Sequence, residues 1–388
     1  MLVLNSGSSS IKFSIYAVPS DGGDPQRLLD GQLSGIGTPD AALEIGGLVE
    51  TAEATDPAQA IAHVLDYLVR PGTPPFEAVG YRVVHPGPKL DRHQRITDAV
   101  LAALEAATAF APLHDPEAVA LIRHTMARFP ALSHFACFDT VFHQTMPEAA
   151  TTYPIPLSFR QQGVRRYGFH GLSCESVVMQ LRKAPGLVFP RRLVIAHLGS
   201  GCSVTALVDG QSVDTSMGLT PTGGVVMGTR PGDLDPGLLF YLLRQPGATL
   251  ESVEQMLNHE SGLKALGGSG DLRRLRASND QPATLALDIF VTSVRRTIGG
   301  MIAVHGIDAL VFTGGIGEHD PLTRAALGSG YATSTGLPEV DAAANQAQGK
   351  GLRRISRDDA RYGIFVVPAE EDLTIAMHVA RLSASDQM

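Results

Sequence analysis

"LVLNSGSSSIKFSIY", residues 2–16, is the stretch that decides the fold of this chain. Its first three residues are apolar and predict a buried strand, and its last six alternate between apolar and polar residues, which predicts a half-buried strand. A turn of small polar residues, Asn5 to Ser10, lies between them. The backbone N–H groups and hydroxyls of such a turn suit phosphate oxygens. An ordinary hairpin with a serine-rich turn is an equally good interpretation.

A second strand–turn–strand unit follows about half a chain later. In "LVIAHLGSGCSVTALVDG" (193–210) an apolar run precedes a turn of small residues (199–203) and another alternating run. His197 stands in this unit where Asn5 stands in the first. The repeat indicates two lobes that each begin with the same unit.

A third glycine-rich stretch is of a different kind. "DALVFTGGIGEH" (308–319) predicts a buried strand and a glycine turn at 314–317, and "DPLTRAAL" after it predicts a helix. This order lets backbone N–H groups approach a nucleotide phosphate. Apolar residues spaced by three and four predict further helices at 56–69, 115–129, 235–243 and 283–305, of which three begin with Asp-Pro. Because strand patterns alternate with these helices, the predicted class is α/β.

Length and composition narrow the protein class. A chain of 388 residues is long enough for two domains, and 44% apolar with 18% charged residues is typical of a globular protein. The net charge of −8 argues against nonspecific nucleic-acid binding. The three cysteines show no CxxC spacing, which excludes a disulfide framework as the organising feature. No leader and no apolar run of membrane-spanning length is found, so we expect a cytoplasmic protein that does not enter a membrane.

A series of motifs then runs in order from residue 4 to residue 376: "LNSGSSSIKF", "YRVVHPG", "APLHDP", "CFDTVFHQTMP", "YGFHGLS", "IAHLGSG", "MGTRPGDLDPG", "GDLRRL", "FTGGIGEH" and "VPAEEDLTIA". Together they resemble the acetate kinase family (acetate and propionate kinases). The resemblance implies an α/β fold of two related lobes of the actin/Hsp70/sugar-kinase type (ASKHA, ribonuclease H-like) around a nucleotide cleft. It places the first lobe at 1–141 plus 373–388, and at 142–372 a second lobe that binds nucleotide and forms a homodimer.

The reaction implied by the resemblance is reversible ATP-dependent phosphorylation of a short-chain carboxylate, acetate or propionate, giving an acyl phosphate and ADP. A carboxylate is already ionised at pH 7 and needs no general base. It needs relief from the repulsion between two anions held in line. The resemblance implies Mg²⁺, for which Mn²⁺ can substitute, near Asn5 and Glu371. The neighbouring Glu370 and Asp372 leave this register open by one residue.

The resemblance also implies the catalytic residues: Arg82, His114, Asp139, His170 and Arg230. The two arginines would clamp the carboxylate and the transferring phosphoryl group, because a guanidinium pairs with two oxygens at once. His170 would donate to a phosphoryl oxygen, and His114 would line the same site. Asp139 would orient an arginine or a metal-bound water, with a structural capping role as the alternative.

Two further sets of positions are carried over from the family. The acid's alkyl group would contact Val84, Leu113, Phe169 and Pro221, a pocket that cannot separate acetate from propionate, because one methylene is worth only about 1–3 kcal/mol. The nucleotide-binding positions are Ser8, Ser9, Ser10, Lys12, His197, Gly199, Ser200, Gly201, Asp271, Leu272, Arg273, Gly315, Ile316, Gly317 and His319.

Some positions depart from the family's pattern. Ser200 and His319 replace asparagines, Leu272 replaces an aromatic residue, and Tyr81 and Cys174 replace histidines. Most of these changes fall on the nucleotide side, so the phosphoryl donor stays open: ATP, another nucleoside triphosphate or pyrophosphate.

Two other readings of the function also stay open. The unusual "VVHPGPK" beside the presumed acid pocket leaves room for another acid, such as butyrate. A non-catalytic, actin/Hsp70-like nucleotide switch is the alternative from a different class. The arginines and histidine that would clamp a carboxylate and a phosphoryl group argue against that switch.

Overall fold

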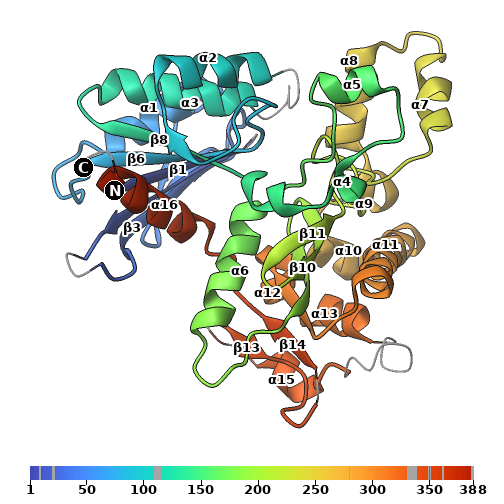
Figure 1. Ribbon diagram of the computed structural model, residues 1–388. Coiled ribbons are helices and arrows are strands. Elements are labelled where there is room, and N and C mark those ends of the chain that lie inside the picture. The colour runs from blue at the N-terminus through green and yellow to red at the C-terminus, as the bar shows by residue number, and fades with distance from the viewer. Residues whose placement is uncertain are drawn as a thin grey trace. The chain divides into compact units, whose positions relative to one another are not determined.

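The computed structural model describes residues 1–7, 10–19, 22–108, 115–278, 280–329, 339–347, 349, 351–360 and 362–385. The chain forms two compact units, each with its own sheet (Figure 1). Unit 1 comprises Met1–Val141 and Glu370–Met388, and unit 2 comprises Phe142–Ala369. The sequence analysis placed the return to the first lobe at residue 373, whereas unit 1 takes the chain back at Glu370. The acidic run Glu370–Asp372 therefore belongs wholly to unit 1.

The sheet of unit 1 has its strands in the order β5-β4-β3-β2-β1-β6-β8-β7. Strand β1 pairs antiparallel with β2 and parallel with β6, and β6 pairs parallel with β8. The predicted hairpin at residues 2–16 is therefore confirmed as β1 and β2. The strands are β1 (Leu2–Gly7), β2 (Ser10–Ala17), β3 (Gln26–Ser34), β4 (Ala42–Ile45), β5 (Leu48–Thr51), β6 (Ala78–Val83), β7 (Gln94–Arg95) and β8 (Ser133–Phe138).

Helices cover both faces of this sheet. Helix α3 contacts β1 and β6, and α1 and α2 pack on α3. Helix α16 packs on β1, β6 and β8 from the other side (Figure 1). The helices are α1 (Pro57–Tyr67), α2 (Asp98–Ala107), α3 (Asp115–Arg128) and α16 (Glu371–Ser385). None of the helices that the structure describes in either unit has the length and apolar composition that a bilayer-spanning segment needs.

The sheet of unit 2 repeats this arrangement, with the order β11-β10-β9-β12-β14-β13. Strand β9 pairs antiparallel with β10 and parallel with β12, and β12 pairs parallel with β14. Because β9, β10 and β12 correspond to β1, β2 and β6, the prediction of two related α/β lobes is confirmed. The strands are β9 (Arg192–Leu198), β10 (Cys202–Val208), β11 (Gln211–Thr215), β12 (Ala309–Thr313), β13 (Arg353–Arg354) and β14 (Gly363–Val366).

In unit 2, helices α6 and α11 lie on opposite sides of β10 and β11 (Figure 1). Cys174, Val177 and Leu181 of α6 are buried in one hydrophobic core with residues of β9, β12 and β14. The helices of this unit include the short 3₁₀-helix η1 (Val141–Thr145), which starts at the junction between the units, and the π-helical turn η2 (Met256–Glu260). The others are α4 (Glu148–Thr151), α5 (Leu157–Gln161), α6 (Gly171–Lys183), α7 (Pro236–Leu243), α8 (Leu250–Gln255), α9 (Gly262–Gly267), α10 (Leu272–Ser278), α11 (Gln281–His305), α12 (Gly314–His319), α13 (Pro321–Gly328) and α15 (Ala342–Gln346).

The predicted helices are present as α1, α3, α7 and α11, and local capping explains where two of them start. Asp56 and Asp235 accept hydrogen bonds from Gln59 N and Gly237 N, with a proline at the first helical position in each case. The side chain of the third such aspartate, Asp115, lies outside the described residues.

The predicted glycine turn at 314–317 is instead the first part of a helix, α12. Gly314 makes this possible because its φ of +76° is open to glycine, and a Cβ there would lie 2.7 Å from Leu198 O. The strand β12 therefore turns directly into α12. Asp320 then caps α13 by accepting from Leu322 N and Thr323 N, so the predicted helix after the turn is confirmed.

Close packing of α16 on β6 predicts a cost for any side chain at Gly80. A Cβ there would lie 2.6 Å from Val379 Cγ2 and 2.7 Å from Ile375 Cγ2. We expect Gly80→Ala to lower the free energy of unfolding by about 1–3 kcal/mol, as overpacking does, in urea denaturation followed by circular dichroism. Gly300→Ala in α11, where a Cβ meets nothing within 4 Å, is the control. It should leave stability unchanged or raise it by about 0.5–1 kcal/mol; equal losses in both variants would contradict the packing argument.

Candidate active site

In unit 1, polar side chains gather at the carboxyl ends of three neighbouring parallel strands. Asn5 lies on β1, Arg82 near the end of β6, and Asp139 directly after β8. Arg82 Nε donates to Asp139 Oδ1 at 3.1 Å and Nη2 to Asp139 Oδ2 at 2.5 Å. Arg82 Nη1 donates to Asn5 Oδ1 at 3.3 Å. The carboxyl edge of a parallel sheet is where α/β proteins bind their ligands.

The pair formed by Arg82 and Asp139 is largely buried. The side chain of Asp139 is 1% exposed and that of Arg82 is 18% exposed. Burial by itself lowers the pKa of Arg82, but the negative charges of Asp139 and Glu371 outweigh it, so the pKa lies above its ordinary value. A bidentate pair of this kind fixes the guanidinium in direction as well as in charge. Of the two roles expected for Asp139, orienting an arginine is the one visible in this geometry.

The three carboxylates of the acidic run at the start of α16 have different partners. Glu370 forms an ion pair with Arg27 at 2.8 Å, and Asp372 Oδ2 accepts from Ser14 Oγ at 2.7 Å. Glu371 is the member of the run whose charge acts most strongly on Arg82. Within this run, the effect on the pKa of Arg82 therefore favours Glu371 over its neighbours as the carboxylate that interacts with Arg82.

Asn5 and Glu371 offer oxygen ligands, which are the type that Mg²⁺ prefers. They lie on β1 and at the start of α16, two elements that pack together. Mg²⁺ keeps several of its waters and needs only one or two protein ligands. The donor set therefore fits a divalent cation of this type.

The remaining positions expected in unit 1 are only partly described. Lys12 on β2 is exposed and lies opposite Asn5 in the β1–β2 register, and Ser10 lies opposite Gly7. Val84 is 9% exposed. Four of the expected positions, Ser8, Ser9, Leu113 and His114, lie outside the described residues.

In unit 2, His170 and His197 form a stacked pair. Their ring centroids are 4.0 Å apart and their planes differ by 17°. His170 Nδ1 forms a hydrogen bond with Ser203 Oγ at 3.0 Å, and His197 Nδ1 forms one with Ser173 Oγ at 2.8 Å. Both imidazoles are nearly buried, with 9% and 8% of the residue exposed. Each ring is therefore fixed by a serine at Nδ1.

The glycine turn between β9 and β10 lies against the Nε2 atoms of this pair. A Cβ at Gly201 would lie 3.3 Å from His170 Nε2 and 3.6 Å from Arg230 Nη1, and a Cβ at Gly199 would lie 3.8 Å from His197 Nε2. Arg230 is held in its loop because Nη1 donates to Pro221 O at 3.0 Å. Nitrogen atoms of three side chains thus lie against the two glycines of this turn.

The start of α12 borders the same turn. A Cβ at Gly199 would lie 4.0 Å from Gly315 N, and Gly315 itself is exposed. Thr313, just before the helix, is fully buried, and its Oγ1 has no hydrogen-bond partner among the described residues. Backbone N–H groups, imidazoles and a guanidinium around an uncovered glycine turn form a cradle that fits phosphate oxygens.

Other nucleotide-side positions differ in how much surface they offer. Asp271 caps α10 by accepting from Arg273 N, and the hydrogen bonds from the Arg273 side chain lower the pKa of Asp271 to about 2. Leu272 is only 3% exposed, so its side chain belongs to the core. Ser200 and His319 are exposed. Phe169 and Pro221 are buried, Ile316 is half-buried and Gly317 is buried in α12.

One residue of this region escaped the sequence analysis. His143 belongs to the quoted motif "CFDTVFHQTMP", but nothing in the sequence assigned it a role. It is fully buried, and its Nε2 donates to Phe169 O at 2.9 Å while Nδ1 lies 2.9 Å from Ser212 Oγ. Burial lowers the pKa of His143 to about 4, against the opposing effect of the bond to Phe169 O. Its partners lie 26 and 69 residues away in sequence, so local patterns could not reveal them.

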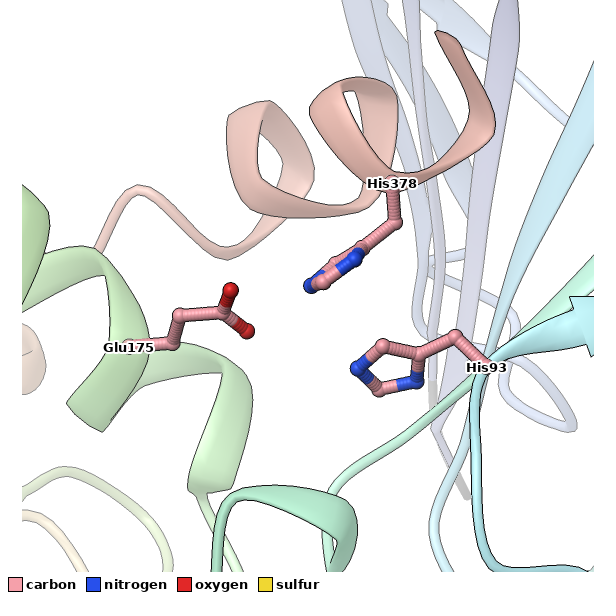
Figure 2. A group of neighbouring side chains, drawn as sticks. All are labelled: His93, Glu175 and His378. Atoms are coloured by element: carbon pink, nitrogen blue, oxygen red, sulfur yellow. The ribbon is translucent and has the colours of Figure 1, made fainter. Parts of the chain in front are cut away.

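A second pair of histidines, which the sequence analysis did not select, lies in unit 1. The rings of His93 and His378 face one another with centroids 4.0 Å apart (Figure 2). His93 Nδ1 accepts a hydrogen bond from Phe138 N at 3.0 Å, which leaves the proton of the neutral ring on Nε2. Burial first, and then unfavourable electrostatic interactions with His378 and Arg381, lower the pKa of His93 to about 3. Glu175, also drawn in Figure 2, is a residue of α6 in unit 2.

Comparison with known proteins shows which family this chain resembles. The model of the acetokinase family matches residues 1–377. The chain is 40% identical to an acetate kinase of Nitrobacter hamburgensis, over 98% of this chain and 96% of that protein. It is 42% identical to an acetate kinase of Pseudarthrobacter chlorophenolicus, over 99% of each chain. A solved propionate kinase of Francisella tularensis superimposes with a TM-score of 0.88 at 35% identity, covering 98% of this chain and 99% of that one.

The buried, neutral state of His143 predicts a pH-dependent stability. The unfolded chain takes up a proton at this residue near pH 6.5, whereas the folded one does so only near pH 4. The unfolded state binds more protons in this window, so the free energy of unfolding should fall as the pH falls, by up to about 1.4 kcal/mol per pH unit for this group.

Urea denaturation at pH 7, 6, 5 and 4.5 measures that slope. His143→Gln should give a shallower slope than the wild type, because it removes the titrating ring. His124→Gln, at an exposed histidine of α3, is the matched control. Identical slopes for the wild type and His143→Gln would contradict the assignment.

Proposed function

The chain belongs to the acetokinase family, and from that premise we propose how its described side chains serve the reaction. The enzyme is a phosphotransferase with a carboxyl group as acceptor: it phosphorylates a short-chain carboxylate with ATP, reversibly, to an acyl phosphate and ADP. Its fold is that of acetate and propionate kinases, as the superposition on the Francisella enzyme and the paired sheets both show.

The chemistry requires charge neutralisation rather than proton transfer. A carboxylate oxygen forms a bond to the γ-phosphorus while the bond from that phosphorus to the β–γ bridging oxygen breaks, and the electron pair leaves with ADP. The carboxylate enters ionised, so no base is needed. The barrier is dominated by bringing one anion in line with another.

The observation that carries the proposal is the convergence of His170 Nε2 and Arg230 Nη1 on Gly201. We assign to the Gly199–Gly201 turn the binding of the phosphate chain, with His170 donating to an oxygen of the transferring phosphoryl group. His197, stacked on His170, serves the same phosphates. Hydrogen-bond donors that are already in position need little reorganisation free energy when the transition state forms, and such sites are effective for this reason.

Arg82 receives a related role in unit 1. Because Asp139 holds two of its nitrogens, the guanidinium keeps one orientation and one charge while a negatively charged ligand approaches. We assign it to the acid's carboxylate and the developing acyl phosphate. The Asp139 carboxylate positions Arg82 and does not itself take part in the bond changes.

We propose Mg²⁺ as the metal, with Mn²⁺ as a substitute, bound by Asn5 and Glu371. A divalent ion at these oxygens neutralises phosphate charge when bound. The charge of Glu371 acts on Arg82, which bonds Asn5, more strongly than that of Asp372, and this supports Glu371 as its ligand.

ATP is the proposed donor, with Asp271, Arg273, Gly315 and Ile316 as contacts of the nucleoside. The buried side chain of Leu272 and the exposed Ser200 and His319 leave GTP and pyrophosphate as donors to compare with it. Acetate or propionate is the proposed acid, with Val84, Phe169 and Pro221 beside its alkyl group; butyrate belongs in the same comparison. We propose the reducing cytoplasm as its location, because the three cysteines, which all lie in the described part of the chain, are buried and form no disulfide.

We also propose a homodimer formed through unit 2. Helix α7 (PGLLFYLL) has no buried residue although six of its eight residues are large and apolar. Exposed apolar side chains also lie just before α5, on α5 and on α8; together with those of α7 they are Ile155, Leu157, Phe159, Leu238, Phe240, Tyr241, Leu243 and Leu250. Apolar surface gathered on neighbouring elements in this way marks an interaction site.

The function is tested by trapping the acyl phosphate as its hydroxamate, with ATP, Mg²⁺ and acetate, propionate or butyrate. Arg230→Ala should lower kcat/KM by about 10²–10³-fold, the usual cost of removing a preorganised charged donor. Arg296→Ala, at an exposed arginine of α11, is the control and should keep wild-type activity. ATP hydrolysis unaffected by any acid would favour the nucleotide switch instead, and activity with pyrophosphate alone would change the donor.

The dimer is tested by light scattering during size-exclusion chromatography. Phe240→Glu, at a residue 58% exposed on α7, should shift the protein from dimer to monomer, because it buries a charge in the interface. Val304→Glu, at a residue 74% exposed on α11, should leave the mass unchanged. A monomeric wild type would refute the proposal.

A further inference from the structure

The backbone of His170 is held in an unfavourable conformation. Its φ is +59° and its ψ is +28°, the left-handed region, which L side chains adopt only at a cost in free energy. Among the described residues only Asp209 is another non-glycine residue with positive φ. Such conformations persist only when the surroundings over-determine them. The contacts that fix this one therefore matter to where the imidazole points.

The turn before α6 is held from several sides. Tyr167 N and Gly168 N both donate to Gly218 O, and Cys174 N donates to His170 O in the first turn of α6. The peptide between Phe169 and His170 has its own partner, because Phe169 O accepts from His143 Nε2 at 2.9 Å. The orientation of this peptide plane sets φ of His170, so His143 acts on the torsion that is strained.

One of the two neutral tautomers of His143, the one with its hydrogen on Nδ1, cannot make this contact. A carbonyl oxygen accepts and never donates, so Nε2 must carry a hydrogen. In the neutral ring Nδ1 then accepts, and Ser212 Oγ at 2.9 Å is its donor. The lowered pKa of His143 keeps the ring neutral at physiological pH. Phe169 O therefore selects the tautomer, and Ser212 on β11 supplies the hydrogen bond at the other ring nitrogen.

The imidazole of His143 also packs closely against the backbone of Gly168. A Cβ at Gly168, whose φ is +76°, would lie 2.8 Å from His143 Cγ and 2.9 Å from Cδ2. The residue is fully buried, so it cannot reach a substrate itself. Its influence on a reaction has to pass through the segment that it holds.

We propose that His143 is a positioning residue: through Phe169 O it holds His170 in the left-handed conformation that aims His170 Nε2 at the Gly199–Gly201 turn. The inference rests on the proposed role of His170 in phosphoryl transfer and adds to it the residue that maintains that geometry. Ser212 contributes to the same geometry, because its hydroxyl forms a hydrogen bond with the other ring nitrogen of His143.

A double-mutant cycle on the full chain tests the proposal. His143→Leu removes the donor but keeps bulk, and we expect kcat to fall about tenfold with KM for ATP within twofold of the wild type. His143→Gln keeps an N–H that can reach Phe169 O and should recover most of the activity. In a His170→Ala background, His143→Leu should cost less than about twofold, because the group that it positions is gone.

Two further variants separate positioning from folding. Thr205→Val removes a buried hydroxyl that pairs with Thr215 on the same sheet and should leave kcat unchanged. Ser212→Ala, a milder change than His143→Leu, should lower kcat in the wild type and not in His170→Ala. An equal loss from His143→Leu in both backgrounds, or equal activities for His143→Leu and His143→Gln, would overturn the proposal.

A readout that does not depend on turnover accompanies the kinetics. In ¹⁵N-histidine NMR, the His170 signals, assigned by their loss in His170→Ala, should shift or broaden in His143→Leu, while those of the exposed His124 stay in place. If the wild type made no acyl phosphate, the proposed function would fail, and these signals would still decide whether His143 positions His170. Unchanged His170 signals in His143→Leu would refute the positioning role.

Discussion

The structure depends on a central strand in each unit that carries an antiparallel hairpin on one side and a parallel strand on the other. In unit 1 this strand is β1, between β2 and β6, and in unit 2 it is β9, between β10 and β12. The hairpin brings a short turn to the same edge as the carboxyl ends of the parallel strands. Asn5, Arg82 and Asp139 lie at this edge in unit 1, and Gly199, Gly201 and Gly314 lie at it in unit 2. One strand order thus yields two sets of groups suited to anions.

The two sets use different physical means. In unit 1 a guanidinium and a carboxylate are buried together, and each holds the other's direction and charge. In unit 2 the donors are two stacked imidazole rings, each hydrogen-bonded to a serine hydroxyl at Nδ1. A protein with a net charge of −8 can therefore bind phosphates by concentrating a few fixed donors, with no need for a basic surface.

The features that the sequence predicted well are those set by neighbours along the chain. The hairpin strands at residues 2–16, the Asp-Pro starts of α1 and α7 and the repeat of the hairpin appear in the structure. The expected half-buried face of residues 11–16 does not, because Ser14 and Tyr16 are each only 2% exposed. The helix at 314–319 was not predicted, because the close approach of Gly314 to Leu198 O, on a strand distant in sequence, cannot be recognised from local sequence. The ligand register at Glu371 stayed ambiguous for the same reason, since Arg27 and Ser14, which engage its neighbours, lie more than 300 residues earlier. The resemblance to a family indicated which positions belong to the site. The contacts of a residue such as His143 could be found only in the three-dimensional structure.

The return of the chain to unit 1 has a consequence for synthesis. Unit 2 is continuous from Phe142 to Ala369, whereas one face of the unit 1 sheet is covered by α16, which leaves the ribosome after all of unit 2. Ile375 and Val379 of that helix fill the space above Gly80 in the sheet centre. During translation one apolar face of the unit 1 sheet therefore stays uncovered until α16 has been synthesised. All residues of unit 2 are available before that point. The core of unit 1 can therefore be completed only after the whole of unit 2 has been synthesised.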